Sequence, residues 1–201
     1  MAVTERTVVI AVTGEIGAGK STVSKILSRL MNCRLIDADV IAAEMWSRPD
    51  VKDMAISRWG DDILDDQGNI IKAEISRHIF ADDEEHKFCN SMIHPLVMEE
   101  IRRRTENIDA VAEIPLLPEA GRPEWVDRAV YVEADFDVRA ERCKSRGWSV
   151  EELRRREKFL LPKEQRMAVC DYIMRNEGSL SDLERQAVKF TQILGAIPHL
   201  L

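Results

Sequence analysis

Apolar residues along the chain follow two different spacings, and these predict alternating strands and helices. Positions 23, 26, 27 and 30 are apolar, a spacing typical of one face of a helix. Short apolar runs rich in β-branched residues predict buried strands at 7–13, 33–36, 110–117, 129–133 and 171–174. A strand, a helix and a second strand in this order indicate a parallel sheet with a right-handed crossover. We therefore expect an α/β fold built on a five-stranded parallel sheet.

Residues 48–108 differ from the rest, because strand patterns are sparse there and helical patterns alternate with turns. The helical pattern at 84–104 contains His94-Pro95, where we expect an interruption, since proline removes a backbone donor. This stretch predicts a helical insertion between the second and third strands. The expected organisation is a single domain, 1–201, with a core of 1–47 and 109–201 and the insertion at about 48–108.

The composition is that of an ordinary globular chain, because 45% of the 201 residues are hydrophobic and 32% are charged. The formal net charge of −7 argues against broad nucleic-acid binding. Apolar runs fall short of the roughly 18 residues that span a bilayer, and the start of the chain lacks a signal-peptide pattern. The four cysteines and four histidines form neither a C-x-x-C pair nor a metal-ligand spacing. We expect a cytoplasmic protein, a monomer or a weak homo-oligomer, that binds neither nucleic acid nor membrane.

A glycine-rich stretch links the first predicted strand to the first predicted helix. It matches G-x-x-x-x-G-K-[ST], the phosphate-binding loop, and consists of Gly14, Glu15, Ile16, Gly17, Ala18, Gly19, Lys20 and Ser21, followed by Thr22. Its glycines allow successive backbone N–H groups to point inward, and the helix after it adds the positive end of its dipole. The pattern therefore predicts a nucleotide triphosphate site made by these nine residues.

Three side chains of this loop have distinct expected roles. Lys20 reaches the β- and γ-phosphates of ATP, and the Ser21 hydroxyl binds Mg²⁺, which prefers oxygen ligands. Thr22 adds a contact to the α-phosphate. The implied cofactors are therefore ATP and Mg²⁺.

Carboxylates follow the second and third predicted strands, at the edge of a parallel sheet where ligands collect. Asp37 and Asp39 come after the second strand, and Glu113 lies near the end of the third. Asp39 is a candidate general base for an attacking hydroxyl, and the alternative is that it caps a helix at 40–46. Glu113 either orients a water on Mg²⁺ or is a structural carboxylate.

A cation-rich stretch follows the fourth strand, in a chain that is otherwise net negative. Its members are Arg139, Arg142, Lys144, Arg146, Arg154, Arg155, Arg156 and Lys158. Interleaved glutamates are typical of a solvated face. The alternative is a mobile lid, at about 142–168, whose arginines neutralise charge over the γ-phosphate.

Taken together, these residues resemble the dephospho-coenzyme A kinase family over most of the chain. The order of motifs is the phosphate loop, D-A-D, H-P, I-P-L-L and D-x-I-x-x-N. The matching residues are 12–23, 36–42, 94–96, 113–117, Arg142, Arg146, 171–173, Asn176 and Gly178. The resemblance implies a three-layer P-loop kinase fold, in which the helical insertion binds the acceptor and the arginine-bearing segment forms the lid.

The resemblance also implies a reaction, the transfer of the ATP γ-phosphoryl group to the ribose 3′-hydroxyl of dephospho-coenzyme A. It implies catalytic roles for Asp39 as base and for Lys20, Arg142 and Arg146 as charge stabilisers. Asn176 is implied near the adenine. The implied substrate-binding residues are Thr13, Asp37, Asp39 and His94.

Four positions depart from the family pattern, namely Glu15 for glycine, Lys72 for arginine, Leu160 for glutamine and Cys170 for alanine. The Glu15 carboxylate must point away from the phosphates, because it would otherwise repel them. Two alternatives stay open, a small-molecule kinase with another acceptor and a non-catalytic nucleotide-binding regulator.

Overall fold

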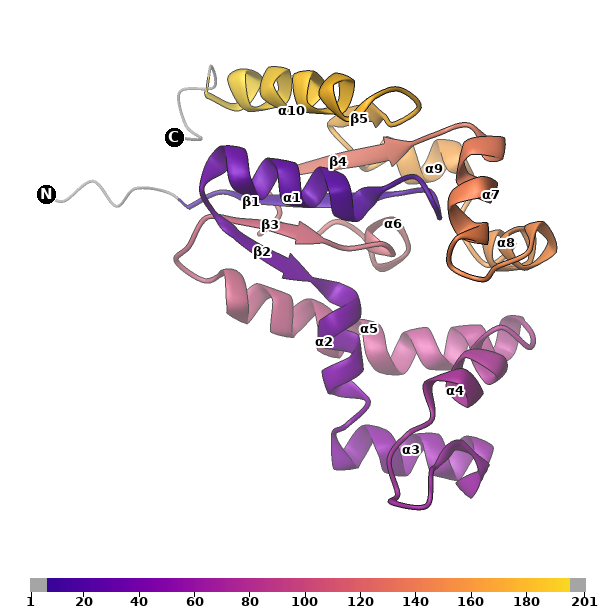
Figure 1. Ribbon diagram of the computed structural model, residues 1–201. Helices are drawn as coiled ribbons and strands as arrows, with labels where there is room; N and C mark the ends of the chain where they lie inside the picture. Colours follow the sequence, from indigo (N-terminus) through magenta and orange to yellow (C-terminus); the bar gives the residue numbers. More distant parts are fainter. Residues whose placement is uncertain (1–6, 196–201) are drawn as a thin grey trace, which may run out of the picture. The chain divides into compact units, whose positions relative to one another are not determined.

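A parallel sheet organises the larger part of the fold. In the computed structural model, which describes residues 7–195, five parallel strands pair in the order β2-β3-β1-β4-β5 (Figure 1). The strands are β1 (Val9–Gly14), β2 (Arg34–Asp37), β3 (Ala110–Glu113), β4 (Arg128–Glu133) and β5 (Tyr172–Arg175). The expected five-stranded parallel sheet of an α/β fold is therefore confirmed.

The helices belong to two compact units, one of residues 38–101 and the other of the rest of the chain. Those of the sheet unit are α1 (Lys20–Met31), α6 (Leu117–Ala120), α7 (Phe136–Lys144), α8 (Val150–Glu157), α9 (Lys163–Ala168) and α10 (Leu180–Gly195). The 38–101 unit contains α2 (Ala38–Met45), α3 (Pro49–Trp59), the 3-10 helix η1 (Asp61–Ile63), α4 (Lys72–Ile79) and most of α5 (Asp83–Thr105).

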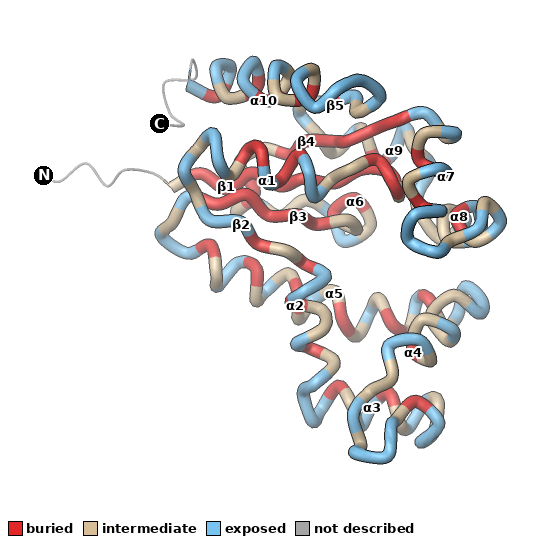
Figure 2. The backbone as a smooth tube through the Cα atoms, viewed as in Figure 1, coloured by how far each residue is buried: buried red, intermediate tan, exposed pale blue. Residues whose placement is uncertain are grey.

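The central strands are buried on both faces, as Figure 2 shows for β1, β3 and β4. On one face, Val12 and Val132 belong to a core cluster with Leu27 of α1 and Phe190 of α10. Side chains alternate along a strand, so Tyr131 projects to the opposite face, where the Arg166 guanidinium of α9 lies 5.6 Å from its ring. Helices therefore cover both faces, which gives the three-layer arrangement.

The register places the carboxyl ends of three strands at one edge of the sheet. Asp37 at the end of β2 is level with Glu113 at the end of β3, and Glu113 is level with Val12 of β1. The phosphate loop begins two residues later, at Gly14. Two carboxylates and the loop thus share the edge where ligands bind in open parallel sheets.

Helix α5 is continuous through Pro95, so the predicted interruption at His94-Pro95 is wrong. Proline removes one backbone hydrogen bond and crowds the preceding turn, at a cost of about 3 kcal/mol in an isolated helix. Here Ile93 and Val97 on either side are 6% exposed. Burial of one helix face across the proline offsets the local cost.

The 38–101 unit has a small core of its own. Ala55, Ile63 and Ile75 are buried, and Trp46 and Trp59 pack against them. The loop from Asp65 to Asn69 is closed by an antiparallel bridge between Leu64 and Ile70, and the Asp65 carboxylate accepts the backbone N–H of Asn69 at 2.7 Å.

Candidate functional site

The phosphate loop turns sharply between β1 and α1, and two glycines make that turn possible. Gly14 has φ +141° and Gly19 has φ +92°, values that side-chain-bearing residues rarely adopt. A Cβ at Gly14 would lie 2.1 Å from the Val132 carbonyl oxygen, and one at Gly19 would lie 2.3 Å from the Asn176 amide nitrogen. Backbone conformation therefore requires glycine at both positions, and the close backbone of Val132 adds a requirement of space at Gly14.

The carbonyl groups of the loop are bound by side-chain donors. Lys20 Nζ donates to the carbonyls of Gly14 at 3.3 Å and Glu15 at 3.0 Å. Arg139 donates to the Ile16 carbonyl at 3.1 Å. Arg142 donates to the carbonyls of Gly17 at 3.5 Å and Ala18 at 3.2 Å. Consecutive carbonyls are thus held by cationic side chains, which fix the backbone of the expected anion nest directly before the N-terminus of α1.

Ser21, the expected Mg²⁺ ligand, lies in the first turn of α1. Its hydroxyl donates to Glu113 Oε1 at 2.9 Å, and Glu113 is 7% exposed. The hydroxyl and carboxylate oxygens suit Mg²⁺, which usually adds phosphate and water ligands. Within residues 7–195, three or more His, Cys, Asp or Glu side chains nowhere gather as a metal cluster. These residues therefore fit a Mg²⁺ ion bound mainly through the nucleotide.

Thr13 and Asp37 lie at the same sheet edge as the loop. The Thr13 hydroxyl donates to the Pro115 carbonyl at 2.9 Å, and Thr13 is only 1% exposed. Asp37, which is half-buried, ends β2 beside Glu113. The fold brings these two predicted site residues close to the loop in the sheet register.

Arg142 and Asn176 are brought together beside the phosphate loop. Arg142 projects from α7 and donates to the backbone carbonyl of Asn176 at 2.8 Å. The Asn176 side-chain amide donates to the Ala18 carbonyl at 2.8 Å. Arg146 is exposed in the turn after α7. Of these residues, Arg142 and Asn176 therefore contact the loop directly.

The cation-rich stretch forms two packed helices, α7 and α8, and most of its cations are exposed, Arg154 and Arg155 among them. Leu153 of α8 is buried against Ala140 and Cys143 of α7. The guanidinium of Arg156 lies 4.1 Å from the Trp148 ring centroid. Ser149 caps α8 by accepting the Glu152 N–H at 3.1 Å.

The Glu15 side chain points away from the anion nest, as charge repulsion requires. It is 5% exposed, and its carboxylate accepts the Ala134 N–H at 3.1 Å. Its own N–H donates to the Val132 carbonyl at 3.0 Å. Among the described residues, those other than glycine with positive φ are Asn32 and Asn107, so Glu15 carries no backbone strain of this kind.

Asp39 and His94 belong to the 38–101 unit. Helix α2 begins at Ala38, so Asp39 lies in its first turn and not at the N-cap, which makes the capping alternative wrong. Burial, with a smaller effect of His86, lowers the pKa of His94. Among the residues that the structure describes, His94 Nε2 is a buried atom without a hydrogen-bond partner.

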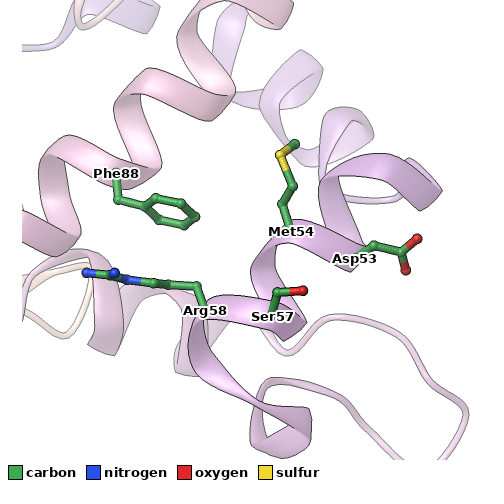
Figure 3. Close-up of a pocket in the computed structure, with 5 residues that line it drawn as sticks. All are labelled: Asp53, Met54, Ser57, Arg58 and Phe88. Atoms are coloured by element: carbon green, nitrogen blue, oxygen red, sulfur yellow. The ribbon is translucent and has the colours of Figure 1, made fainter.

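Two hollows are found in the 38–101 unit. A pocket of about 180 Å³ is lined by residues that include Trp46, Lys52 and Lys72. The other is an open depression of about 410 Å³, lined by Asp53, Met54, Ser57, Arg58 and Phe88 (Figure 3). There Arg58 lies 5.3 Å from the Phe88 ring centroid and is already paired with Glu84 and Glu85. In the smaller pocket the Lys52 ammonium donates to the Gly68 carbonyl, a neutral group, so this pocket is the better match for an anionic ligand.

Comparisons with known proteins identify the family. A family model described as dephospho-CoA kinase matches residues 8–182. The chain belongs to the dephospho-CoA kinase family. A dephospho-CoA kinase of Aquifex aeolicus (strain VF5) is 30% identical over 194 residues, which cover 94% of this chain and 98% of that protein.

Solved structures agree with the fold. The crystal structure of TT1252 from Thermus thermophilus aligns with a TM-score of 0.73 at 30% identity, over 94% of this chain and 97% of that one. A dephospho-CoA kinase from Campylobacter jejuni, 23% identical, aligns with a TM-score of 0.64 over 92% and 95% of the two chains. Dephospho-CoA kinases are phosphotransferases, so this family membership makes the protein an ATP-using kinase.

Among the described helices, none combines the length and apolar character that crossing a membrane requires.

Sequence reasoning missed two residues that bind the loop's acidic side chain. Arg139 Nε lies 3.5 Å and Lys163 Nζ lies 3.4 Å from the Glu15 carboxylate. Arg139 was visible only as one of many cations in its stretch. The departure at position 15 was the available signal, because a buried carboxylate requires a cation nearby.

Proposed function

We propose that this protein transfers the γ-phosphoryl group of ATP to the ribose 3′-hydroxyl of dephospho-CoA. The observation that carries the proposal is the phosphate loop, whose carbonyls at 14–18 accept hydrogen bonds from Lys20, Arg139 and Arg142. Membership of the dephospho-CoA kinase family supplies the acceptor. The loop supports triphosphate binding, and the family supports the choice of alcohol.

The loop residues 14–22 would hold the triphosphate through backbone N–H groups and Lys20. Lys20 Nζ, which contacts two loop carbonyls, would exchange these contacts for β- and γ-phosphate oxygens. Ser21 would bind Mg²⁺ together with phosphate oxygens, and the ion, when bound, neutralises charge on the phosphates. We propose that Asn176 lies near the adenine while its amide holds the Ala18 carbonyl.

The transfer joins the acceptor 3′-oxygen to the γ-phosphorus, while the bond from that phosphorus to the β–γ bridging oxygen breaks and ADP leaves. Asp39 would accept the proton of the hydroxyl. Lys20 with Arg142 and Arg146 of the lid would stabilise the charge that develops on the phosphoryl oxygens. Thr13, Asp37 and His94 would contact the acceptor.

The acceptor carries a diphosphate, which requires cations. We propose that the 38–101 unit binds it through the pocket lined by Lys52 and Lys72. Lys72 supplies a point charge and not the bidentate fork that arginine offers. Substitution of Lys72 is therefore expected to change the KM for the acceptor and not the KM for ATP.

The test is ADP formation in a coupled assay, with dephospho-CoA, adenosine and shikimate offered separately as acceptors. We expect ADP only with dephospho-CoA, and loss of the signal when EDTA removes Mg²⁺. Asp39→Asn should abolish turnover while ATP still binds, whereas Lys20→Ala should reduce both. Lys72→Met should raise the KM for dephospho-CoA alone. ATP binding without ADP formation on any acceptor would contradict the proposed activity, and ADP formation with shikimate would assign a different acceptor.

A further inference from the structure

The acidic residue inside the phosphate loop is held by two cations from distant parts of the chain. Glu15 Oε2 lies 3.5 Å from Arg139 Nε, and Glu15 Oε1 lies 3.4 Å from Lys163 Nζ. Arg139 belongs to α7 and Lys163 begins α9, so the two cations lie on either side of α8 in the chain. One loop side chain is thus linked to both ends of the segment that carries α8.

Each of these cations has further partners that extend the network. Arg139 is 6% exposed and also donates to the carbonyls of Ala134 at 3.0 Å and Ile16 at 3.1 Å. It forms an additional ion pair with Glu157, the last residue of α8. The contacts therefore run from the loop to α7 and to the end of α8.

The second branch of the network reaches the sheet. Lys163 Nζ lies 2.8 Å from Glu133 Oε2, and Arg175 lies 2.7 Å from Glu133 Oε1. Burial acts to raise the pKa of Glu133, but the hydrogen bonds from Lys163 and Arg175 outweigh it and lower the pKa. The Glu133 carboxylate is therefore ionised, and Lys163 lies between the carboxylates of Glu133 and Glu15.

We propose that Glu15 is a positioning residue that links the phosphate loop to the lid segment through Arg139 and Lys163. This inference rests on the proposed phosphotransfer. Glu15 does not face the anion nest, since its carboxylate is turned to Ala134 and the two cations. Its effect on the reaction passes through the lid segment, whose arginines must lie at fixed distances from the developing charge.

This position predicts a split between binding and turnover. In Glu15→Gln the backbone of the nest is retained, and one negative charge close to the phosphates is removed, so the KM for ATP should change by less than about threefold. The lid segment loses an ionic link at each end, and kcat should fall by about tenfold, as misplacement of a charge-stabilising group does. A merely structural role would lower stability without this split.

The experiment compares Glu15→Gln with Glu152→Gln as a matched control. Glu152 also forms ion pairs within the lid segment, with Arg155 at 2.8 Å and Arg156 at 2.6 Å, and these pairs do not involve the loop. The same amide substitution there should leave kcat within about twofold. Lys163→Arg should retain most of the wild-type kcat, whereas Lys163→Met should lower kcat as much as Glu15→Gln does. In the double variant Glu15→Gln/Lys163→Met, kcat should fall by less than the product of the two single-variant factors.

A second measurement does not depend on the acceptor. Hydrogen–deuterium exchange of residues 145–160 should be faster in Glu15→Gln than in Glu152→Gln. Addition of ATP with Mg²⁺ should also slow the exchange of these residues less in Glu15→Gln than in Glu152→Gln. If the wild-type chain forms no ADP with dephospho-CoA, the proposed activity fails while the exchange result still decides the role of Glu15. Equal exchange and an unchanged kcat in Glu15→Gln would overturn the inference, and so would a large rise in the KM for ATP without a fall in kcat.

Discussion

Gly14 offers a sharp test of the loop geometry, because the chain contains a matched glycine that lacks its close contact. Gly14 has φ +141° and Gly121 has φ +79°. A Cβ at Gly14 would meet the backbone of Val132 at 2.1 Å, whereas one at Gly121 would have no heavy atom within 4 Å. Alanine at either position meets backbone strain, and only at Gly14 does it also collide with a central strand.

The expected magnitudes follow from these two terms. A residue forced into glycine-only backbone space costs about 1 to 3 kcal/mol, and replacing glycine returns roughly 0.4 to 1 kcal/mol through the unfolded state. Gly121→Ala should therefore lower the free energy of unfolding by about 1 to 2 kcal/mol. Displacing the Val132 backbone adds about 1 to 3 kcal/mol, so Gly14→Ala should cost about 2 to 5 kcal/mol.

Equilibrium urea denaturation, followed by far-ultraviolet circular dichroism, measures both values. The slope m should stay constant in the two variants, because neither changes the surface exposed on unfolding. A folded Gly14→Ala variant should also bind ATP more weakly than the wild type, since the loop must move. Equal losses of stability in Gly14→Ala and Gly121→Ala would refute the close approach of the loop to β4.

Two further predictions concern buried polar groups. Tyr131 is fully buried, and its hydroxyl lacks a hydrogen-bond partner in the described part of the chain. Tyr131→Phe should therefore raise the free energy of unfolding by about 1 kcal/mol, and half-buried Tyr172→Phe should not; a loss in calorimetry would show that the hydroxyl is bonded. Burial lowers the pKa of His94 from 6.5. The neutral His94 of the folded state therefore makes its full contribution to the free energy of unfolding above pH 6.5, and this contribution is lost as the pH falls from there toward the folded pKa. Each such histidine contributes a slope of up to about 1.4 kcal/mol per pH unit, and His94→Gln should flatten the urea-derived profile between about pH 7 and pH 5.5.

The strand-loop-helix element could be predicted because its determinants are local. The apolar run, the glycines and the periodic residues of 23–30 all lie within one continuous stretch. The strand order could not be read in the same way, since β1 pairs with β3 and β4 and not with β2. That choice depends on packing between residues far apart in the chain, for which a single sequence carries no periodic signal.

Pro95 shows how packing can override a local rule. Proline disfavours a helix interior wherever it occurs, and the sequence alone gives this rule full weight. The structure adds Ile93, Val97 and Ile101, which are buried along one face of α5 across the proline. A chain that buries apolar side chains on both sides of the proline gains more than the lost hydrogen bond costs.

Position 15 combines these lessons. From the loop motif alone, glutamate at position 15 is expected to strain the backbone and to repel the bound phosphates. The backbone threat is absent, because the Glu15 N–H bonds to Val132 and positive φ outside glycine occurs, among the described residues, at Asn32 and Asn107. The charge threat is answered by Arg139 and Lys163, more than a hundred residues away in the chain. Charge compensation, and not conformational freedom, therefore decides whether this loop tolerates glutamate. Removing the Lys163 ammonium should therefore lower kcat more in the wild-type chain than in a chain that already carries Glu15→Gly.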